Sequence, residues 1–209
     1  MSDLSVEETI SPLPHELSTT DKSDFINIKS SFVCEYDKDE NKDDADVGQC
    51  CETNDDVGSV RASNPIPSTC QSYYFEMKVL NRGEKGYIGI GLTSSGSDLT
   101  NMPGWLENTV GYHGDDGKLF YEECEQRGTA SRYGPKFGFN DVVGCGVDMK
   151  KRTVFFTING KYLGTAVSNL PDKTWYPTIG LHSKNEMVEV NFGQHPFIYN
   201  ISDFSGTTI

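Results

Sequence analysis

Residues 152–160 read Arg152-Thr-Val-Phe-Phe-Thr-Ile-Asn-Gly160, and they combine a β-strand with the signal for a tight reversal. Every second side chain of this strand is apolar, and a period of two is typical of a strand with one buried face. Those side chains are Val154, Phe156 and Ile158. Asn and Gly both accept the positive φ angles of a type I′ turn, so we expect a β-hairpin that reverses at Asn159-Gly160.

The segments on either side extend this hairpin into a three-stranded meander. Residues 161–163, Lys-Tyr-Leu, can return as the partner strand. Upstream, the apolar run Asp141-Val-Val-Gly-Cys-Gly-Val-Asp148 is joined to the hairpin by the polar residues 149–151. Three antiparallel strands in succession are among the smallest β-units that can be stable on their own.

Alternating segments continue on both sides of the meander, with turn signals at spacings of roughly 8–12 residues, as in an antiparallel sandwich or barrel. Helix is expected at most as a short turn near residues 101–102. The fold class is therefore predicted to be all-β, with the last two of its strands forming a pair. We expect the remaining strands over residues 25–33, 59–62, 73–80, 87–93, 119–121, 176–181 and 187–192.

Gly89 and Gly91 both fall inside an expected strand. Glycine within a strand often marks the close approach of another backbone or of a bulky ring. The Gly-Ile-Gly pattern also begins a dinucleotide-binding fingerprint, but Ser94 stands at the position of the last glycine and no helix is expected to follow. The two glycines therefore predict close packing and not a nucleotide site.

The acidity of the chain is concentrated near its N-terminus. The protein has 209 residues and a net charge of −13. Residues 1–57 hold 16 acidic residues against four lysines, a net charge of −12, whereas the rest of the chain is close to neutral at −1. Phosphate contacts need a basic surface, so nucleic acid is not an expected partner.

These patterns divide the chain into one β-domain and flanking segments. We expect a disordered acidic tail over residues 1–22, a domain over 23–205 that includes an acidic loop at 35–57, and a short tail at 206–209. No apolar run is long enough to cross a bilayer, and the first residues do not resemble a secretory signal. We therefore expect no membrane partner, reduced cysteines, and a location in the cytoplasm with the nucleus as a second site.

One local pattern permits an enzyme. His113 and Asp115 share the Gly-rich stretch 111–117, where a hydrolase or metal site is conceivable. Asp-Asp-Gly is also an ordinary turn sequence, and the chain has no Gly-x-Ser-x-Gly elbow. Cys145 lies in an apolar strand and is expected to be an inert buried thiol. We predict no catalytic residue, no metal site and no cofactor.

Two tryptophans have open assignments. Trp105 follows a Pro-Gly turn beside Ser, Asp and Asn residues, so it is either core or a surface anchor for a partner. Trp175 precedes Tyr176-Pro177, and either assignment is open there as well.

A series of motifs in a fixed order resembles the SPRY domain family. The strings Gly111-Tyr-His-Gly-Asp-Asp-Gly117 and Asn191-Phe-Gly-Gln194 point to its RanBPM (Ran-binding protein M) branch. The similarity is close over residues 58–203 and looser over 23–34. The other motifs that carry it are Asp56-Val-Gly-Ser-Val-Arg-Ala-Ser-Asn-Pro-Ile-Pro67, Tyr73-Tyr-Phe-Glu-Met-Lys-Val79, Gly86-Tyr-Ile-Gly-Ile-Gly-Leu92, Pro103-Gly-Trp105, Tyr133-Gly-Pro135, Asp141-Val-Val-Gly-Cys145, Phe155-Phe-Thr-Ile-Asn-Gly160 and Tyr176-Pro-Thr-Ile-Gly180.

The resemblance implies a bent, antiparallel two-sheet β-sandwich, a concanavalin-like jelly roll, that is not an enzyme. SPRY domains bind short peptides or protein surfaces through loops at one edge of the sandwich. RanBPM-like proteins are scaffolds of a CTLH-type ubiquitin ligase, in which helical LisH and CTLH modules follow the SPRY domain. At the end of the region of similarity, only residues 203–209 remain here. The function implied is a substrate-recruiting or scaffold component of such a ligase, and the alternative is a stand-alone adaptor or effector.

The resemblance also implies a peptide-binding edge, which we expect to act in a monomer. Some peptide-binding relatives have a basic residue where this chain has Asn64, and an aromatic residue near His182 that is absent here, so an acidic, Asn-rich peptide is not the expected ligand. We expect Arg61 and Met102 to be the main anchors. A third hypothesis makes the acidic residues 35–56 a docking segment for a basic partner. The candidate binding residues are Arg61, Asn64, Pro65, Pro67, Leu99, Met102, Pro103, His182 and Ser183.

Overall fold

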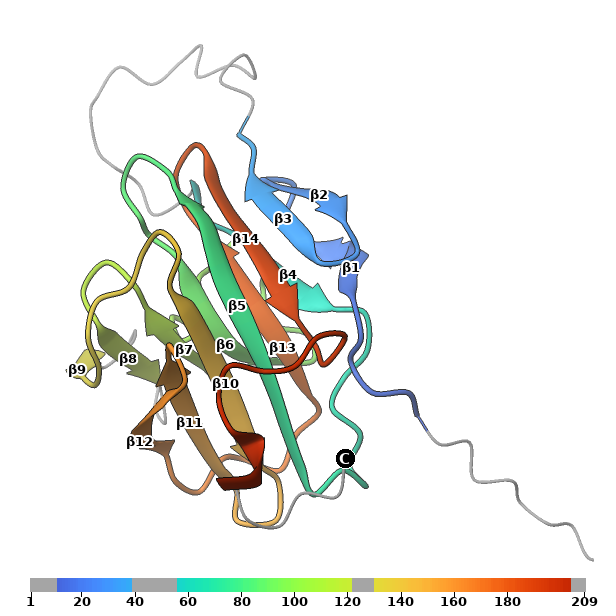
Figure 1. The fold of residues 1–209 in the computed structure, drawn as a ribbon. Coiled ribbons are helices and arrows are strands. Elements are labelled where there is room, and N and C mark those ends of the chain that lie inside the picture. Colours follow the sequence, from blue (N-terminus) through green and yellow to red (C-terminus); the bar gives the residue numbers. More distant parts are fainter. Residues whose placement is uncertain (1–10, 39–55, 122–129, 204–209) are drawn as a thin grey trace, which may run out of the picture.

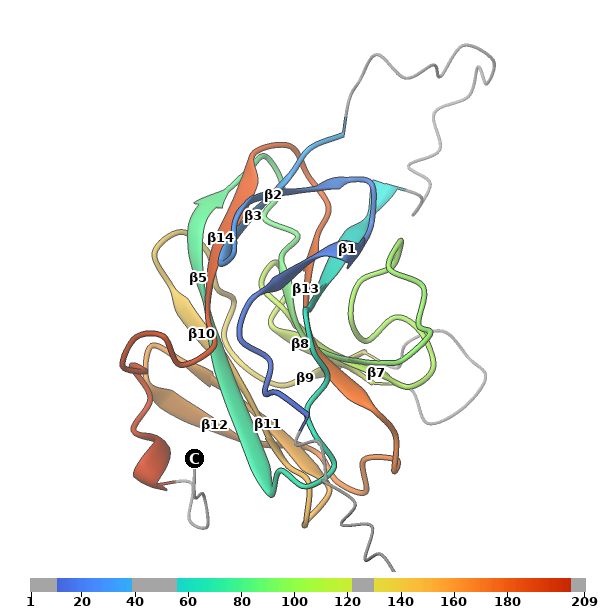
Figure 2. The same cartoon turned by 90° about the vertical axis from the view of Figure 1, so that its right-hand side faces the viewer.

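The computed structural model describes residues 11–38, 56–121 and 130–203. Within these residues the chain forms fourteen strands in two seven-stranded sheets, which lie face to face as a sandwich (Figures 1 and 2). All neighbouring strands in both sheets are antiparallel. This arrangement confirms the predicted fold class.

The first sheet and its loops hold all of the predicted binding residues. Its strands, in spatial order, are β1 (Leu17–Lys22), β4 (Gly58–Ala62), β13 (Trp175–Leu181), β6 (Gly89–Ser94), β7 (Thr109–His113), β8 (Lys118–Tyr121) and β9 (Ala130–Arg132). The second sheet consists of β12 (Lys161–Val167), β11 (Thr153–Ile158), β10 (Val142–Asp148), β5 (Ser72–Arg82), β14 (Glu186–Asn191), β3 (Val33–Tyr36) and β2 (Ile26–Ser30).

The meander predicted from residues 141–164 forms one side of the second sheet. β10 pairs with β11, and β11 pairs with β12. The reversal between β11 and β12 has positive φ at both central residues, 49° at Asn159 and 77° at Gly160, as a type I′ turn requires. The Asn159 side chain also accepts a hydrogen bond from the Val142 backbone N–H at 2.9 Å, which ties the turn to the start of β10.

The hydrophobic core lies between the two sheets. Alternate residues of β5, namely Phe75, Met77 and Val79, are fully buried there, as their spacing predicted. Trp175 is also fully buried, and its indole N–H donates to the Pro171 carbonyl at 3.0 Å, which settles its open assignment as core. Burial raises the pKa of the Cys145 thiol well above its ordinary value, so this cysteine stays protonated.

The last described segment crosses the outer face of the second sheet, where it covers a smaller aromatic cluster of Tyr74, Phe155 and Tyr199. Figure 2 shows this segment outside the sheet, ending in the short 3₁₀ turn η2 (Ile201–Asp203). Its backbone is held by Glu76, whose carboxylate accepts hydrogen bonds from the N–H groups of Ile198 and Tyr199, each at 3.0 Å. The segment is therefore an integral part of the sandwich.

Two predictions about the N-terminal region were wrong. Residues 17–22 were expected to be a disordered tail, but they form β1, which pairs with β4. Its sequence, Leu-Ser-Thr-Thr-Asp-Lys, has no apolar periodicity, and the strand exists because an edge of the first sheet provides a partner. The single strand expected over 25–33 is the hairpin β2–β3, in which the Ser30 hydroxyl accepts the Val33 N–H and closes the turn.

Two further differences concern strand pairing. The strands expected to form the last pair, β13 and β14, lie in different sheets, because the chain crosses from one sheet to the other between them. No strand was expected over residues 109–113, yet they form β7, an internal strand of the first sheet. The predicted acidic loop at 35–57 lies mostly outside the described residues, and its first two residues belong to β3. No helix in the described residues is long and apolar enough to cross a membrane.

Candidate functional site

The residues predicted to form one binding edge lie at two ends of the first sheet. β4 runs antiparallel to β13, with Arg61 opposite Thr178 and Gly58 opposite Leu181. The residues after β4 therefore lie beside the start of β13, where the Ile66 N–H donates to the Trp175 carbonyl at 2.8 Å. His182 and Ser183 follow the other end of β13. Antiparallel pairing thus separates the segment 61–67 from the segment 182–183.

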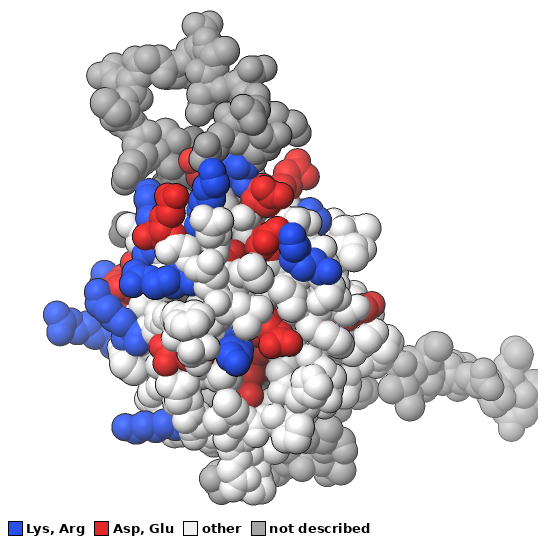
Figure 3. Space-filling model, turned by 45° about the horizontal axis from the view of Figure 1, so that its top comes forward, with Lys and Arg blue, Asp and Glu red and all other residues white. Residues whose placement is uncertain are grey.

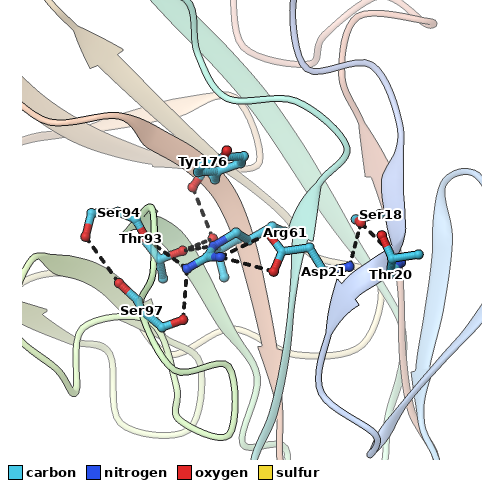
Figure 4. Close-up of polar contacts among 9 residues, drawn as sticks. Ser18, Thr20, Asp21, Arg61, Thr93, Ser94, Ser97 and Tyr176 are labelled. Atoms are coloured by element: carbon cyan, nitrogen blue, oxygen red, sulfur yellow. Dashed lines mark hydrogen bonds and ion pairs between the residues drawn. The ribbon is translucent and has the colours of Figure 1, made fainter.

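Arg61 is buried and fully engaged (Figure 4). Its Nη1 donates to both carboxylate oxygens of Asp21 at 3.0 and 3.1 Å, and its Nε donates to the Thr93 hydroxyl at 3.0 Å. Its Nη2 donates to the backbone carbonyls of Ser94 and Ser97 at 2.8 and 2.9 Å. Only 5% of Arg61 is exposed. Because Asp21 lies on β1 and Thr93 and Ser94 lie on β6, these contacts link β4 to both strands.

The surroundings of Arg61 explain why an arginine is accommodated there. Its guanidinium lies 5.2 Å from the centre of the Tyr176 ring, a cation–π geometry. One of the two carbonyls that it binds belongs to Ser94, the last residue of β6, and the other to Ser97 in the loop at 95–108, so the guanidinium fixes where this loop leaves β6. Arg61 therefore supports the loop from inside the fold, whereas the sequence suggested it as an anchor that contacts a partner.

The loop at 95–108 folds back across the outer face of the first sheet. The Ser59 N–H donates to the Leu99 carbonyl at 2.8 Å, and the Ser59 hydroxyl donates to the Asn101 carbonyl at 2.7 Å. Met102 is only 2% exposed and lies against Gly180, where an added Cβ would come within 2.5 Å of the Met102 sulfur. Leu99, Met102 and Pro103 are therefore buried, and they position the residues that follow them.

A pocket of about 290 Å³ opens where this loop meets the far end of the first sheet. It lies between four segments, at residues 85–87, 102–105, 113–116 and 182, together with Asp56 and Phe120. Of the predicted binding residues, it brings together only Met102 and His182. On the face shown in Figure 3, acidic and basic side chains are interspersed.

Aromatic rings form two walls of this pocket. On one wall the His113 ring stacks on Phe120 at 4.2 Å between centroids, and Trp105 lies 6.2 Å from His113. On the other wall Tyr87 and His182 are 5.3 Å apart. Trp105 is partly exposed, and it lines the pocket instead of joining the central core. The pocket therefore offers ring faces and edges, which are suited to a side chain of a partner.

Glu186 holds the second wall from inside the fold. It is fully buried at the start of β14, and its carboxylate accepts the backbone N–H of Tyr87 at 2.7 Å and of His182 at 2.7 Å. The N–H and hydroxyl of Ser183 donate to the same carboxylate. Burial raises the pKa of Glu186, and these four donors oppose that rise. In the sequence, Glu186 stands only as a glutamate before an apolar strand, and nothing there indicates that it binds the backbones of two loops.

His113 is committed to the structure. Its Nε2 donates to the Pro103 carbonyl at 2.9 Å, which requires the proton on Nε2 because a carbonyl only accepts. Burial lowers the pKa of His113 to about 4, so the ring is neutral at neutral pH. Among the described residues, no group of three or more His, Cys, Asp or Glu side chains could hold a metal ion. The hydrolase and metal hypotheses for His113 and Asp115 thus gain no support from this geometry.

A scan for protein families matches residues 72–195 to the SPRY domain. The chain belongs to the SPRY family. Among curated proteins, this SPRY domain is 42% identical to mouse Ran-binding protein 9 over 199 residues, 95% of the chain and 28% of that protein. It is 46% identical to the Drosophila melanogaster Ran-binding proteins 9/10 homolog over 69% of the chain and 15% of that protein. It is 40% identical to the Arabidopsis thaliana Ran-binding protein M homolog over 73% of the chain and 32% of that protein.

Solved structures agree with this assignment. A human SPRY domain crystal structure superposes with a TM-score of 0.67 at 26% identity, covering 84% of this chain and 99% of the other. The SPRY domain of human HERC1 superposes with a TM-score of 0.66 at 15% identity, over 86% and 99%, and it supports the fold alone. The SPRY domain spans less than a third of the Ran-binding protein 9 relatives from mouse and human, whose remaining length lies outside this comparison.

The buried imidazole of this SPRY domain predicts a specific pH dependence. The unfolded chain protonates His113 below about pH 6.5, whereas the folded protein resists protonation down to about pH 4. Stability contributed by the neutral ring is therefore complete above pH 6.5 and is lost as the pH falls toward 4. Between pH 7.5 and pH 5, we expect the His113→Gln variant to lose about 2 kcal/mol less unfolding free energy than the parent.

Urea unfolding at the two pH values measures this difference. The comparison cancels the titration of the other acids, because they are present in both proteins. Equal losses in parent and variant would show that His113 is already protonated, or already exposed, in the folded state.

Proposed function

We propose that this SPRY domain is a protein-interaction module that binds a protein or a short peptide at the pocket between Met102, Trp105 and His182. The observation that carries this proposal is the pocket itself, which lies among loops at one end of a rigid sandwich. Its membership of the SPRY family and its similarity to Ran-binding protein 9 support the same conclusion. The domain is proposed to act without catalysing a reaction and without a cofactor.

The individual binding residues have different proposed roles. Met102, Pro103, His182 and Ser183 belong to the pocket end of the sheet, where a partner would make its contacts. Arg61 is proposed to support the loop that carries them. Asn64, Pro65 and Pro67 lie at the opposite end, and Leu99 is buried on β4. They are proposed to contribute only if the partner extends across the sheet.

The finer proposal is that the domain recruits substrates to, or scaffolds, a CTLH-type ubiquitin ligase in the cytoplasm or nucleus. Its support is the similarity to Ran-binding protein 9, 10 and M homologues over most of the chain. The alternative is an adaptor or effector outside that complex. The chain covers only 28% of mouse Ran-binding protein 9. The proposed ligase role is therefore limited to the part that a SPRY domain would contribute.

A quantitative pull-down tests both levels of the proposal. The tagged domain is co-expressed with subunits of a CTLH-type ligase, and bound subunits are measured for the parent and for a Trp105→Ala, His182→Ala double variant. Loss of two pocket residues should reduce recovery by at least about tenfold, since anchor residues are typically worth about 2 kcal/mol or more. Tyr162→Ala is the matched control, because Tyr162 is an exposed aromatic residue on β12 of the other sheet.

The possible outcomes test the binding pocket and the ligase role separately. Full recovery by a double variant that unfolds at the same temperature as the parent would reject the pocket as the binding site. Binding of a purified partner other than a ligase subunit, lost in the double variant but not in the control, would support the module and reject the ligase role.

A further inference from the structure

One wall of the pocket carries a carboxylate that forms no ion pair with a described residue. Asp115 and Asp116 both line the pocket, but their surroundings differ. Asp116 forms an ion pair with Lys118 at 2.8 Å and also accepts the Lys118 backbone N–H. Asp115 forms no ion pair with any described residue, although it is partly buried. Burial and the neighbouring Asp116 raise the pKa of Asp115, while the more distant charges of Lys136 and Lys118 partly oppose this rise, and a cation entering the pocket would lower the pKa further.

Aromatic rings stand in the same pocket as this carboxylate. Trp105 and Phe120 line the pocket together with Asp115, and Phe120 stacks on the neutral ring of His113. Aromatic faces attract ammonium and guanidinium groups, and Trp is the strongest partner. Burial keeps His113 uncharged, and the nearby Lys118 is already paired with Asp116. Rings beside a carboxylate make up the chemistry that binds a basic side chain.

The opposite wall already holds a cation over a ring. The Lys85 ammonium lies 5.7 Å from the centre of the Tyr87 ring, which also lines the pocket. An ammonium over an aromatic ring is therefore compatible with the local geometry. The positive charge of Lys85 would repel a basic side chain there, so we expect such a side chain on the side of Asp115.

We propose that the pocket receives a lysine or arginine side chain of the bound partner, with Asp115 as its counter-ion and Trp105 and Phe120 as the rings against which it packs. This inference rests on the proposed function, because it names the chemistry of the residue that enters the same site. It agrees with the expectation that an acidic, Asn-rich peptide is not the ligand.

Nuclear magnetic resonance with a minimal probe tests this inference directly. N-acetyl-arginine amide is titrated into the domain while the indole N–H signals of the two tryptophans are followed. The Trp105 signal should shift in a saturable manner, and the Trp175 signal, from a fully buried ring, should stay in place. N-acetyl-citrulline amide, which has nearly the same shape without the charge, should bind at least about fivefold more weakly.

Substitutions then assign the counter-ion. Asp115→Asn should weaken arginine binding by about fivefold, because it removes the charge and keeps the shape. Glu107→Gln is the matched control, since Glu107 is an exposed acid near Trp105 in the chain and does not line the pocket. Equal effects of the two substitutions would indicate nonspecific attraction and would overturn the proposal.

Two other outcomes would also overturn it. The first is equal binding of the citrulline and arginine probes, and the second is a larger Trp105 shift with N-acetyl-glutamate amide, which would assign the pocket to an acidic side chain beside Lys85. The proposed function can survive either outcome. If the Trp105→Ala, His182→Ala variant still loses its protein partner while arginine fails to bind, only the basic-residue inference is wrong.

Discussion

Replacing Arg61 with alanine should lower the free energy of unfolding by about 3 kcal/mol. The substitution leaves the carbonyls of Ser94 and Ser97 without their donor and removes the link to Asp21 on β1. A buried polar group that loses its partner costs about 1–3 kcal/mol, and Arg61 satisfies several such groups. Equilibrium unfolding in urea, followed by tryptophan fluorescence, measures the loss.

Two further variants identify the origin of this effect. Arg132→Ala removes an exposed arginine from β9 of the same sheet and should change stability by less than about 0.5 kcal/mol. Arg61→Lys keeps the charge but not the planar set of donors, so it should recover less than half of the loss. If Arg61→Ala were as stable as the parent, the contacts in Figure 4 would not contribute to folding.

Gly91→Ala should cost about 3 kcal/mol or more, or prevent folding. A Cβ on Gly91 would lie 1.8 Å from the Val110 carbonyl oxygen, which belongs to the backbone of β7. The strand cannot move away, because β6 is paired with β7 on one side and with β13 on the other. This confirms the close backbone approach that the glycines of this strand predicted.

A graded series makes the glycine prediction testable even if Gly91→Ala does not fold. On Gly89 an added Cβ meets the His113 ring at 3.2 Å, so Gly89→Ala should have an intermediate effect. On Gly138 it meets nothing within 4 Å, so Gly138→Ala should leave the midpoint of thermal unfolding within a few degrees of the parent. Midpoints that do not follow this order would show that backbone clash is not the cause.

The sequence predicted those strands in which apolar residues occupy every second position. β5, β10 and β11 present apolar residues at every second position to the core, so local pattern and tertiary structure agree. β1 and β7 were missed for the opposite reason. β1 is polar and forms because β4 offers it an edge, and β7 contains Gly111 and His113, which are atypical of a central strand.

The site was less predictable because its contacts join residues far apart in the chain. Arg61 was expected to be an anchor for a partner, whereas it is buried, and the residues that it contacts are 32 to 40 positions away in the sequence. Met102 and His182, which were expected to share a binding edge, line the same pocket, whereas the pairing of β4 with β13 places Asn64 and Pro65 at the opposite end. Trp105 and Asp115 were both considered in the sequence, but their spacing did not show that they line the same pocket.

Glu186 has a consequence for how tightly this domain can bind. Its single carboxylate fixes the backbones of Tyr87 and His182, so one wall of the pocket is preorganised before any ligand arrives. A partner that enters there does not have to order these loops, and the entropic cost of association is correspondingly smaller. Affinity should then follow the chemistry of the inserted side chain, while the other loops of the sandwich remain free to vary without deforming the pocket.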